Sequence, residues 1–390
     1  MFAETTHTDQ YTVSQPHLYM AFELSQSKWM LGFTIGFGQR PRLRTIAARD
    51  LAALRDEIHL ARERFGLGEE VPVISCYEAG RDGFWLHRYL LSLGVTNLIV
   101  DSASIEVNRR AKQAKTDKLD LGKLLTMLMR YQAGEKKVWH VVHVPSPEVE
   151  DHRHLHRELA DLKAQRTQHT NRIKGYLSNQ GVCLEVRDDF PELVEHQRLW
   201  NGEPLPPGLQ ARLLCEYERF QLVQQQVKAL EVERRETIRH STQPEMEQVR
   251  QLLHLRGIGI NAAWLYVMEF FCWRAFRNRR EVGALAGLTP MPHQSGEEDH
   301  ELGISKVGNR HIRAMAIEIA WGWLRYQPNS ELSRWYQRRF GKGSKRLHKI
   351  GTLAPDASAG VVALARKLLI ALWRYLEFGT LPTGAVLKST

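Results

Sequence analysis

Two long polar segments with helical periodicity divide this chain into regions of different character. In residues 146–181 and in residues 209–255, apolar positions recur sparsely at intervals of three and four, which is the pattern of a coiled-coil seam. The stretch between the two segments contains four prolines and must turn the chain. We therefore expect an antiparallel coiled-coil arm over residues 146–251. It would serve equally well as a plain helical spacer or as an arm that oligomerises or spans nucleic acid.

The region before the arm alternates between strand and helix patterns. Residues 18–37 predict two strands joined by a polar turn, and residues 48–65 have the apolar periodicity of a helix. Two β-branched runs follow, each succeeded by a helical segment. This order predicts an α/β domain with a mixed sheet over residues 18–145, preceded by a short polar arm over residues 1–17.

The region after the arm, residues 252–390, is predicted to be a mainly helical domain. It opens with two helical segments joined by a turn that contains Gly257 and Gly259. This turn resembles a helix-hairpin-helix motif, whose backbone N–H groups face phosphate without reading the base sequence. A tight interhelical turn that binds no ligand would have the same sequence.

The overall charge indicates a class of partner. The 390 residues carry a net charge of +10, which makes nucleic acid a plausible partner, although ordinary solubility also explains it. No apolar run approaches the roughly 18 residues of a membrane span, and the N-terminus lacks the pattern of a secretory signal. The four cysteines form no CxxC pair, so neither a zinc site nor a disulfide framework is indicated. We expect a cytoplasmic protein without a membrane partner.

Positive charge is concentrated in two runs. The run from Asn108 to Lys118 packs five basic residues around one acid, and the run from Arg334 to Lys349 has seven Lys and Arg and no acid. Aromatic residues interleave in the second run, as on surfaces that follow a phosphate backbone, whereas a solvated helix end has a similar composition. The candidate phosphate contacts in the two runs are Arg109, Arg110, Lys112, Lys115, Arg338, Arg339, Lys345 and Arg346.

Four acidic residues form the candidate catalytic group. Asp117 and Asp120 lie three apart in a predicted helix and therefore share a face. Glu23 lies within the apolar first strand and Glu78 follows a buried strand, where an acid is costly unless it is paired or bound to a metal. Carboxylate oxygens are the ligands that Mg²⁺ prefers, and two such ions about 3.5–4 Å apart can stabilise the attacking and leaving oxygens of a phosphate.

Each of these acids alone has an ordinary explanation. Aspartates in a first helical turn are favoured by the helix dipole, and Lys118 or Lys123 could pair with them. Glu78 alone could form a salt bridge at the end of its strand. Only the combination of the four, in this order along the chain, favours a Mg²⁺ site.

The run KTDKLDLGKL, with the strand acid and the strand-end Glu before it, resembles a known signature. It is similar to the DEDD motif of RuvC-like transposases of the insertion-sequence 110 family, which are related to Piv-type DNA invertases. The first acid of that family is usually Asp in a GIDxSK-like strand, whereas this chain has AFELSQSKW with Glu23 in that place. The resemblance implies an RNase H/RuvC-like fold for residues 18–145, with Mg²⁺ bound by Glu23, Glu78, Asp117 and Asp120.

A second resemblance covers the C-terminal region. The elements GIG, ALAGLTP, SG and ISKVGNRHIR follow one another as in the C-terminal transposase domain of the same family. The resemblance assigns the role of proposed nucleophile to Ser295, whose hydroxyl would form a covalent phosphoserine with DNA. Without it, Ser295 in a polar loop beside Gly296 is a turn former, with His293 as the nearest base.

The same region contains three further basic candidates. On a helix, Lys306, Arg310 and Arg313 would share one face and could grip phosphate, although an ordinary solvated face is an equally good explanation.

These observations favour a DNA recombinase of the insertion-sequence kind, that is, a transposase that cleaves and rejoins DNA strands. The resemblance implies a noncoding bridge RNA that pairs with donor and target DNA. The long arm suggests a homodimer or homotetramer, and we expect association with the nucleoid. The alternatives are a metal-dependent RuvC-like nuclease, such as a junction resolvase, and a non-catalytic nucleic-acid-binding scaffold.

Overall fold

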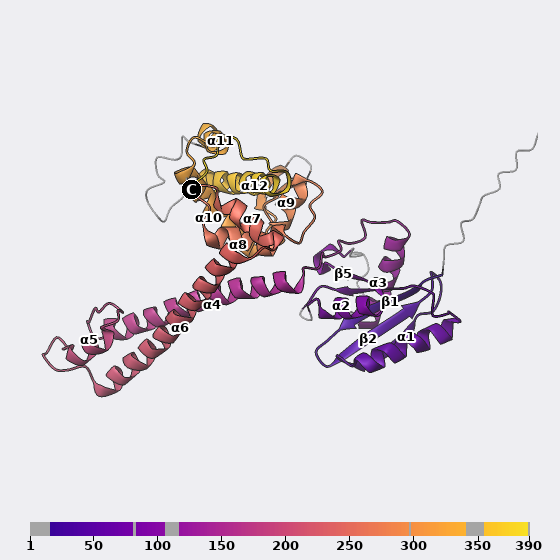
Figure 1. Cartoon of the computed structure of the whole chain (residues 1–390), viewed down its shortest axis with the longest axis horizontal. Coiled ribbons are helices and arrows are strands. Elements are labelled where there is room, and N and C mark those ends of the chain that lie inside the picture. The colour runs from indigo at the N-terminus through magenta and orange to yellow at the C-terminus, as the bar shows by residue number, and fades with distance from the viewer. Residues whose placement is uncertain (1–15, 81–82, 106–116, 296–297, 341–354, 389–390) are drawn as a thin grey trace, which may run out of the picture. The chain divides into compact units, whose positions relative to one another are not determined.

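The protein divides into two compact units, residues 1–144 and residues 145–390. Their structure comes from a computed structural model (Figure 1). It describes residues 16–80, 83–105, 117–295, 298–340 and 355–388. Within these ranges it leaves out the side chains of residues 103, 117–118, 292–302 and 355–359. The separate boundaries of the arm (146–251) and the C-terminal domain (252–390) stay predictions.

The N-terminal unit is built on a five-stranded mixed sheet, as the sequence predicts. Its order is β3-β2-β1-β4-β5, in which β1, β2 and β3 are antiparallel neighbours and β4 and β5 run parallel to β1. A polar turn closes the first hairpin, where the Ser25 hydroxyl donates to the Lys28 carbonyl at 2.6 Å. The strands are β1 (Leu18–Leu24), β2 (Lys28–Thr34), β3 (Arg42–Ala47), β4 (Val73–Glu78) and β5 (Thr96–Val100).

Helices cover both faces of this sheet. Because side chains alternate along a strand, Met20 and Phe22 face the core under α1 (Leu51–Phe65) and α2 (Trp85–Ser92). A short 3₁₀ turn, η1 (Ser102–Ser104), follows β5.

The opposite face of the sheet belongs to α3 (Asp117–Gln132), which packs on β1, β2 and β4. Ala21 and Cys76 form a core there with Leu121 and Leu124 of α3. Helix α3 lies close to β2, because a Cβ at Gly32 would lie 3.0 Å from the Leu121 side chain. The first turn of α3, which contains Asp117 and Asp120, is therefore fixed over the face that carries Ala21 and Cys76.

Two long helices begin the second unit, α4 (Pro147–Ser178) and α6 (Pro207–His240). The Ser146 side chain caps α4 by accepting from the Val149 N–H. The helices run antiparallel, because ion pairs join Lys163 to Glu231 and Arg172 to Glu216. Buried apolar side chains line their contact, and α5 (Phe190–His196) lies in the connection between them. The helices match the prediction, and their winding as a coiled coil stays a prediction.

The rest of the second unit is helical apart from one hairpin. The centre of its core is α12, which packs against α7, α9, α10 and α11. None of the helices in the described ranges combines the length and the apolar character needed to cross a membrane. The elements are α7 (Pro244–Leu253), α8 (Ile260–Tyr266), the π-helix η2 (Val267–Phe271), α9 (Arg279–Leu285), β6 (Pro290–Ser295), β7 (Glu298–Ile304), α10 (Arg310–Tyr326), α11 (Glu331–Phe340) and α12 (Pro355–Phe378).

Candidate carboxylate site and nucleic-acid interface

Two of the four predicted acids come together at the end of the sheet. The register between β1 and β4 pairs Phe22 with Tyr77, so Glu23 and Glu78 occupy equivalent positions on neighbouring parallel strands. Strand alternation places both on the face that α3 covers. They line one cavity of about 310 Å³ at the strand ends. The structure thus places a strand acid beside a strand-end acid, as expected.

The other two acids belong to α3. Asp120 is half-buried, and the side chain of Asp117 lies outside the described residues. No three His, Cys, Asp or Glu side chains among those described are grouped as metal ligands. The four-carboxylate site therefore stays a prediction, and it depends on Asp117.

The chemistry of the strand ends suits a hard cation. Burial, with the charge of Glu78 adding to it, raises the pKa of the Cys76 thiol, which therefore stays protonated. Cys76 does not line the cavity, and the charged groups of the lining are the carboxylate oxygens of Glu23 and Glu78. Such oxygens fit Mg²⁺ better than Zn²⁺.

The second unit contains a large and strongly basic cavity, which we call the basic groove. Its volume is about 1210 Å³, and α9, α11, α12 and the base of the β6–β7 hairpin line it. Its only acid among the lining residues is Glu331. The cationic lining residues are Arg279, Arg280, Lys306, Arg339, Arg366, Lys367 and Arg374.

Aromatic and unpaired polar groups accompany these charges. Trp335 is half-buried on the groove, with the Lys367 ammonium 4.6 Å from its ring centre and the Phe340 ring at 5.8 Å. The Nε of Arg366 is buried without a hydrogen-bond partner among the described residues. Stacking surfaces beside cations are what a nucleic-acid strand needs.

The hairpin that carries Ser295 begins at the basic groove. Pro290 and Ile304, which face each other at the base of the hairpin, line the groove, and Ser295 is the last residue of β6, paired with Glu298. The expected polar loop is therefore a strand, because pairing with β7 orders a segment whose prolines and polar residues look irregular by themselves. The side chains of Ser295 and His293 lie outside the described residues.

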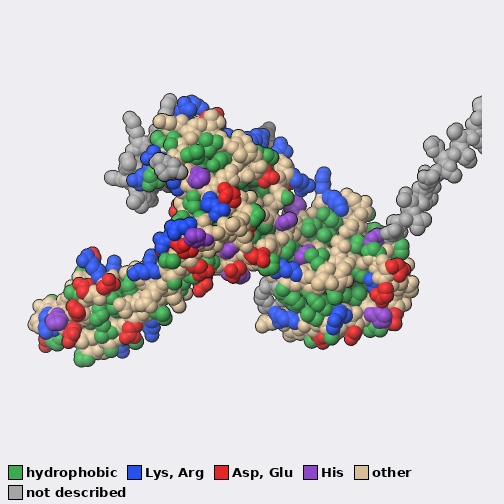
Figure 2. Space-filling model, viewed as in Figure 1, with side chains coloured by type: hydrophobic (Ala, Val, Ile, Leu, Met, Phe, Trp, Pro, Cys, Tyr) green, Lys and Arg blue, Asp and Glu red, His purple; other side chains and the backbone are tan. Residues whose placement is uncertain are grey.

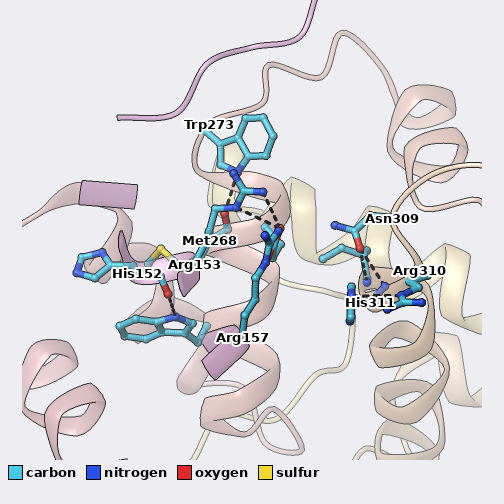
Figure 3. A network of polar contacts seen from close by, with 11 residues as sticks. His152, Arg153, Arg157, Met268, Trp273, Asn309, Arg310 and His311 are labelled. Carbon is cyan, nitrogen blue, oxygen red and sulfur yellow. Dashed lines mark hydrogen bonds and ion pairs between the residues drawn. The ribbon is translucent and has the colours of Figure 1, made fainter. Parts of the chain in front are cut away.

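The interpretation of Lys306, Arg310 and Arg313 as one helical face is wrong. The Asn309 side chain accepts from the backbone N–H groups of His311 and Ile312, so α10 begins only at Arg310 (Figure 3). Lys306 lies before it with a φ of 54° and lines the basic groove. The guanidinium of Arg313 donates to the Lys306 carbonyl at 3.0 Å, so it supports this loop, while Arg310 is exposed.

The two glycines of the GIG turn differ. Gly257 has a φ of +93°, and a Cβ there would lie 3.2 Å from the Cβ of Tyr326, so the turn itself requires glycine. Gly259 has no such constraint, and both glycines line a separate cavity of about 550 Å³.

The remaining basic candidates divide into two sets. Arg338 is exposed on α11 and Arg339 lines the basic groove. Six others lie outside the described residues, namely Arg109, Arg110, Lys112, Lys115, Lys345 and Arg346.

Sequence reasoning missed the contribution of α9 and α12 to the groove. Arg366, Ile370 and Arg374 recur at intervals of four, which places them on one helical face. This signal was present, but the apolar residues between them made the segment resemble a core helix.

A buried ion-pair cluster joins the base of α4 to the π-helix (Figure 3). Arg153 contacts the carboxylate of Glu269 at 3.2 Å and Arg157 donates to it at 2.8 Å, and Glu269 is only 2% exposed. Burial by itself raises the pKa of Glu269, but the hydrogen bond from Arg157 and the charge of Arg153 outweigh it and hold that pKa below its ordinary value. The cluster anchors one end of the arm.

Neighbouring carboxylates on a mixed sheet and a basic groove are features expected of a protein that processes a polyanion. Residues 249–336 match the model of the Transposase IS116/IS110/IS902 family. The chain is 40% identical over 384 residues to the putative transposase y4rJ of Sinorhizobium fredii, covering 95% of each chain. The chain belongs to the IS116/IS110/IS902 family of transposases, as the sequence motifs indicated.

Two more distant relatives are transposases of named elements. The chain is 27% identical to the transposase for insertion sequence element IS1328 of Yersinia enterocolitica, over 61% of this chain and 67% of that protein. It is 25% identical to the transposase for insertion sequence element IS1533 of Leptospira borgpetersenii, over 76% of this chain and 79% of that protein.

Proposed function

We propose that this transposase cleaves and rejoins the DNA strands of a bacterial insertion sequence, with DNA held in the basic groove and Ser295 as nucleophile. The observation that carries the proposal is the position of the β6–β7 hairpin, whose base lines a groove with seven cations and one acid. A polyanionic backbone in this groove would pass the base of the hairpin whose first strand ends at Ser295.

The chemical step is a transesterification. The Ser295 oxygen forms a bond to phosphorus and releases its proton, while the bond from phosphorus to the leaving sugar oxygen breaks and that oxygen takes up a proton. The resulting phosphoserine conserves the phosphodiester bond energy. Attack by a sugar hydroxyl of another strand reverses the exchange, joins the new strand and restores the serine.

The N-terminal unit would supply a Mg²⁺ site. The order of its strands and the equivalent positions of Glu23 and Glu78 support an RNase H/RuvC-like fold with a DEDD site. In this proposal Asp117 and Asp120 complete the ligand set. When bound, Mg²⁺ would stabilise the charge that develops on the phosphate oxygens.

The proposal extends to partners. A structured noncoding bridge RNA would select donor and target DNA, and the net charge of +10 supports binding of both nucleic acids. The α4–α6 pair would join protomers into a homodimer or homotetramer at the nucleoid. Its surface mixes both signs of charge, as Figure 2 shows, and so favours complementary contact between copies over simple attraction to a polyanion.

The decisive experiment traps the covalent intermediate. Wild-type protein, RNA and labelled donor DNA are mixed with Mg²⁺, denatured and separated by mass. We expect a protein–DNA adduct that Ser295→Ala abolishes while DNA binding persists. Cleavage to free ends in Ser295→Ala would instead identify a water-using nuclease, and intact strands with wild-type protein would identify a binding scaffold.

Neutralising the groove should weaken binding in a salt-dependent way. The triple variant Arg366→Gln, Lys367→Gln and Arg374→Gln removes about three phosphate contacts, so the slope of log affinity against log salt should fall by roughly 2–3 and affinity by about 10²–10³-fold. Fluorescence anisotropy with duplex DNA measures both. The matched control neutralises three exposed arm residues, Lys174, Lys228 and Arg239. If the two triple variants had equal salt slopes, the basic groove would not be part of the DNA interface.

A further inference from the structure

A second basic cavity lies where the α4–α6 pair meets the glycine turn between α7 and α8. It measures about 550 Å³ and shares no lining residue with the basic groove. Lys163, Arg234 and Arg235 supply its positive charges, and Glu231 and Glu318 its negative ones. The Glu231 carboxylate already pairs with the Lys163 ammonium at 2.6 Å. The two arginines therefore face the cavity with one exposed carboxylate, Glu318, besides that pair.

Arg234 is the unusual member of this lining. It is only 4% exposed, and its Nε and Nη1 have no hydrogen-bond partner among the described residues. Burial lowers the pKa of its guanidinium, and the neighbouring Glu231 only partly opposes that effect. Because an unpaired buried cation is costly, an anion that supplied acceptors to Arg234 would be bound favourably.

A second side chain near Arg234 also has a buried nitrogen without a hydrogen-bond partner in the described part of the chain. Burial, together with the charges of Arg234, His311 and Lys163, lowers the pKa of the nearby His156 to about 4, although the charge of Glu269 opposes the shift. The Nδ1 of His156 likewise has no hydrogen-bond partner among the described residues.

Gly259 leaves the cavity open. Its φ of −99° and ψ of 170° suit any residue, and a Cβ there would meet no atom within 4 Å. Packing and backbone conformation thus explain the glycine at position 257 but not the one at 259. A side chain at 259 would occupy the space beside Arg234 and Arg235.

We infer that this cavity is a phosphate-binding site, in which Arg234 and Arg235 hold one backbone phosphate of a DNA duplex beside Gly259. The inference rests on the proposed function, because it takes DNA as the ligand. It adds a contact outside the basic groove, from a helix of the arm, so the duplex would be held at two places on the second unit.

Two variants test this site in the full-length protein. Gly259→Val places a side chain in the cavity without straining the backbone, and Arg234→Gln removes the buried charge. Both should bind a duplex about tenfold more weakly than wild type and reduce the salt slope by about one. Lys228→Gln neutralises an exposed residue on the same helix. It should change the affinity by no more than about twofold and leave the salt slope close to that of wild type. Thermal melting identifies any variant that fails to fold.

The outcomes separate this inference from the proposed function. If wild type binds and cleaves DNA while Gly259→Val keeps its affinity and slope, the phosphate site is overturned and the proposed function stands. If wild type binds no duplex, both are overturned. If Gly259→Val melts like wild type and loses one unit of slope, the site is supported even if Arg234→Gln does not fold.

Discussion

Replacing Glu78 with glutamine is expected to reduce DNA strand cleavage at least about hundredfold while DNA binding stays unchanged. Glu78 and Glu23 line one cavity at equivalent positions of neighbouring strands, and a carboxamide there would weaken binding of the proposed Mg²⁺ ion. Losing about 3 kcal/mol of transition-state stabilisation corresponds to slightly more than a hundredfold in rate. Single-turnover cleavage of labelled donor DNA, with anisotropy on the same preparation, measures rate and affinity separately.

The chain offers a matched control for that experiment. Glu70→Gln makes the same chemical change on an exposed residue of the same unit and should leave the cleavage rate within twofold of wild type. Glu23→Gln and Asp120→Asn should behave like Glu78→Gln. If all three of these variants cleaved DNA at the wild-type rate, the acidic residues would have a structural role and no catalytic one.

The second large effect is on folding. Glu269→Ala should lower the free energy of unfolding by about 3 kcal/mol, because it leaves Arg153 without the carboxylate that the buried cluster provides. We place the value at the lower end of the usual range because the Arg157 side chain is half-exposed. Urea denaturation followed by tryptophan fluorescence gives the difference. The exposed pair of Arg187 and Glu185 is the comparison, and Glu185→Ala should cost about 1 kcal/mol or less.

The same cluster predicts a pH dependence. The pKa of Glu269 is lower in the folded protein than its ordinary value of 4.5, so the carboxylate adds stability above pH 4.5 and that contribution disappears as the pH falls through the folded pKa. The difference in stability between wild type and Glu269→Gln should therefore be constant above pH 5 and shrink below pH 4.5. A difference that grew on acidification would contradict the depressed pKa.

Local periodicity predicted the sheet and the long helices because each depends on neighbouring residues. Strand alternation and the polar turn at residues 25–28 sufficed for the first hairpin, and the position of Glu23 and Glu78 followed from the parallel pairing of two apolar runs. The sites in the second unit depend instead on residues brought together from distant segments. Arg279, Lys306 and Arg374 meet only because α12 packs on both α9 and α10.

Three local features were also not predicted from the sequence. The β6–β7 hairpin is hidden by Pro290 and Pro292, which are uncommon within strands. Lys306 adopts a left-handed backbone conformation that non-glycine residues seldom take. The π-helix that presents Glu269 differs from an α-helix by one residue in its hydrogen-bond spacing, a change without a compositional signature.

The ion pairs of Arg153 and Arg157 with Glu269 fix α4 near one end, so a small tilt there moves its other end by a larger distance. From Arg157 to the far end of α4 at Ser178 the helix extends about 30 Å, at 1.5 Å per residue. A tilt of only 10° at the ion-pair cluster would displace that far end by roughly 5 Å. A molecule that bound the arm near the exposed indole of Trp200 would therefore exert force on a buried carboxylate at the other end, and this force would reach η2 and α8, on which α4 packs.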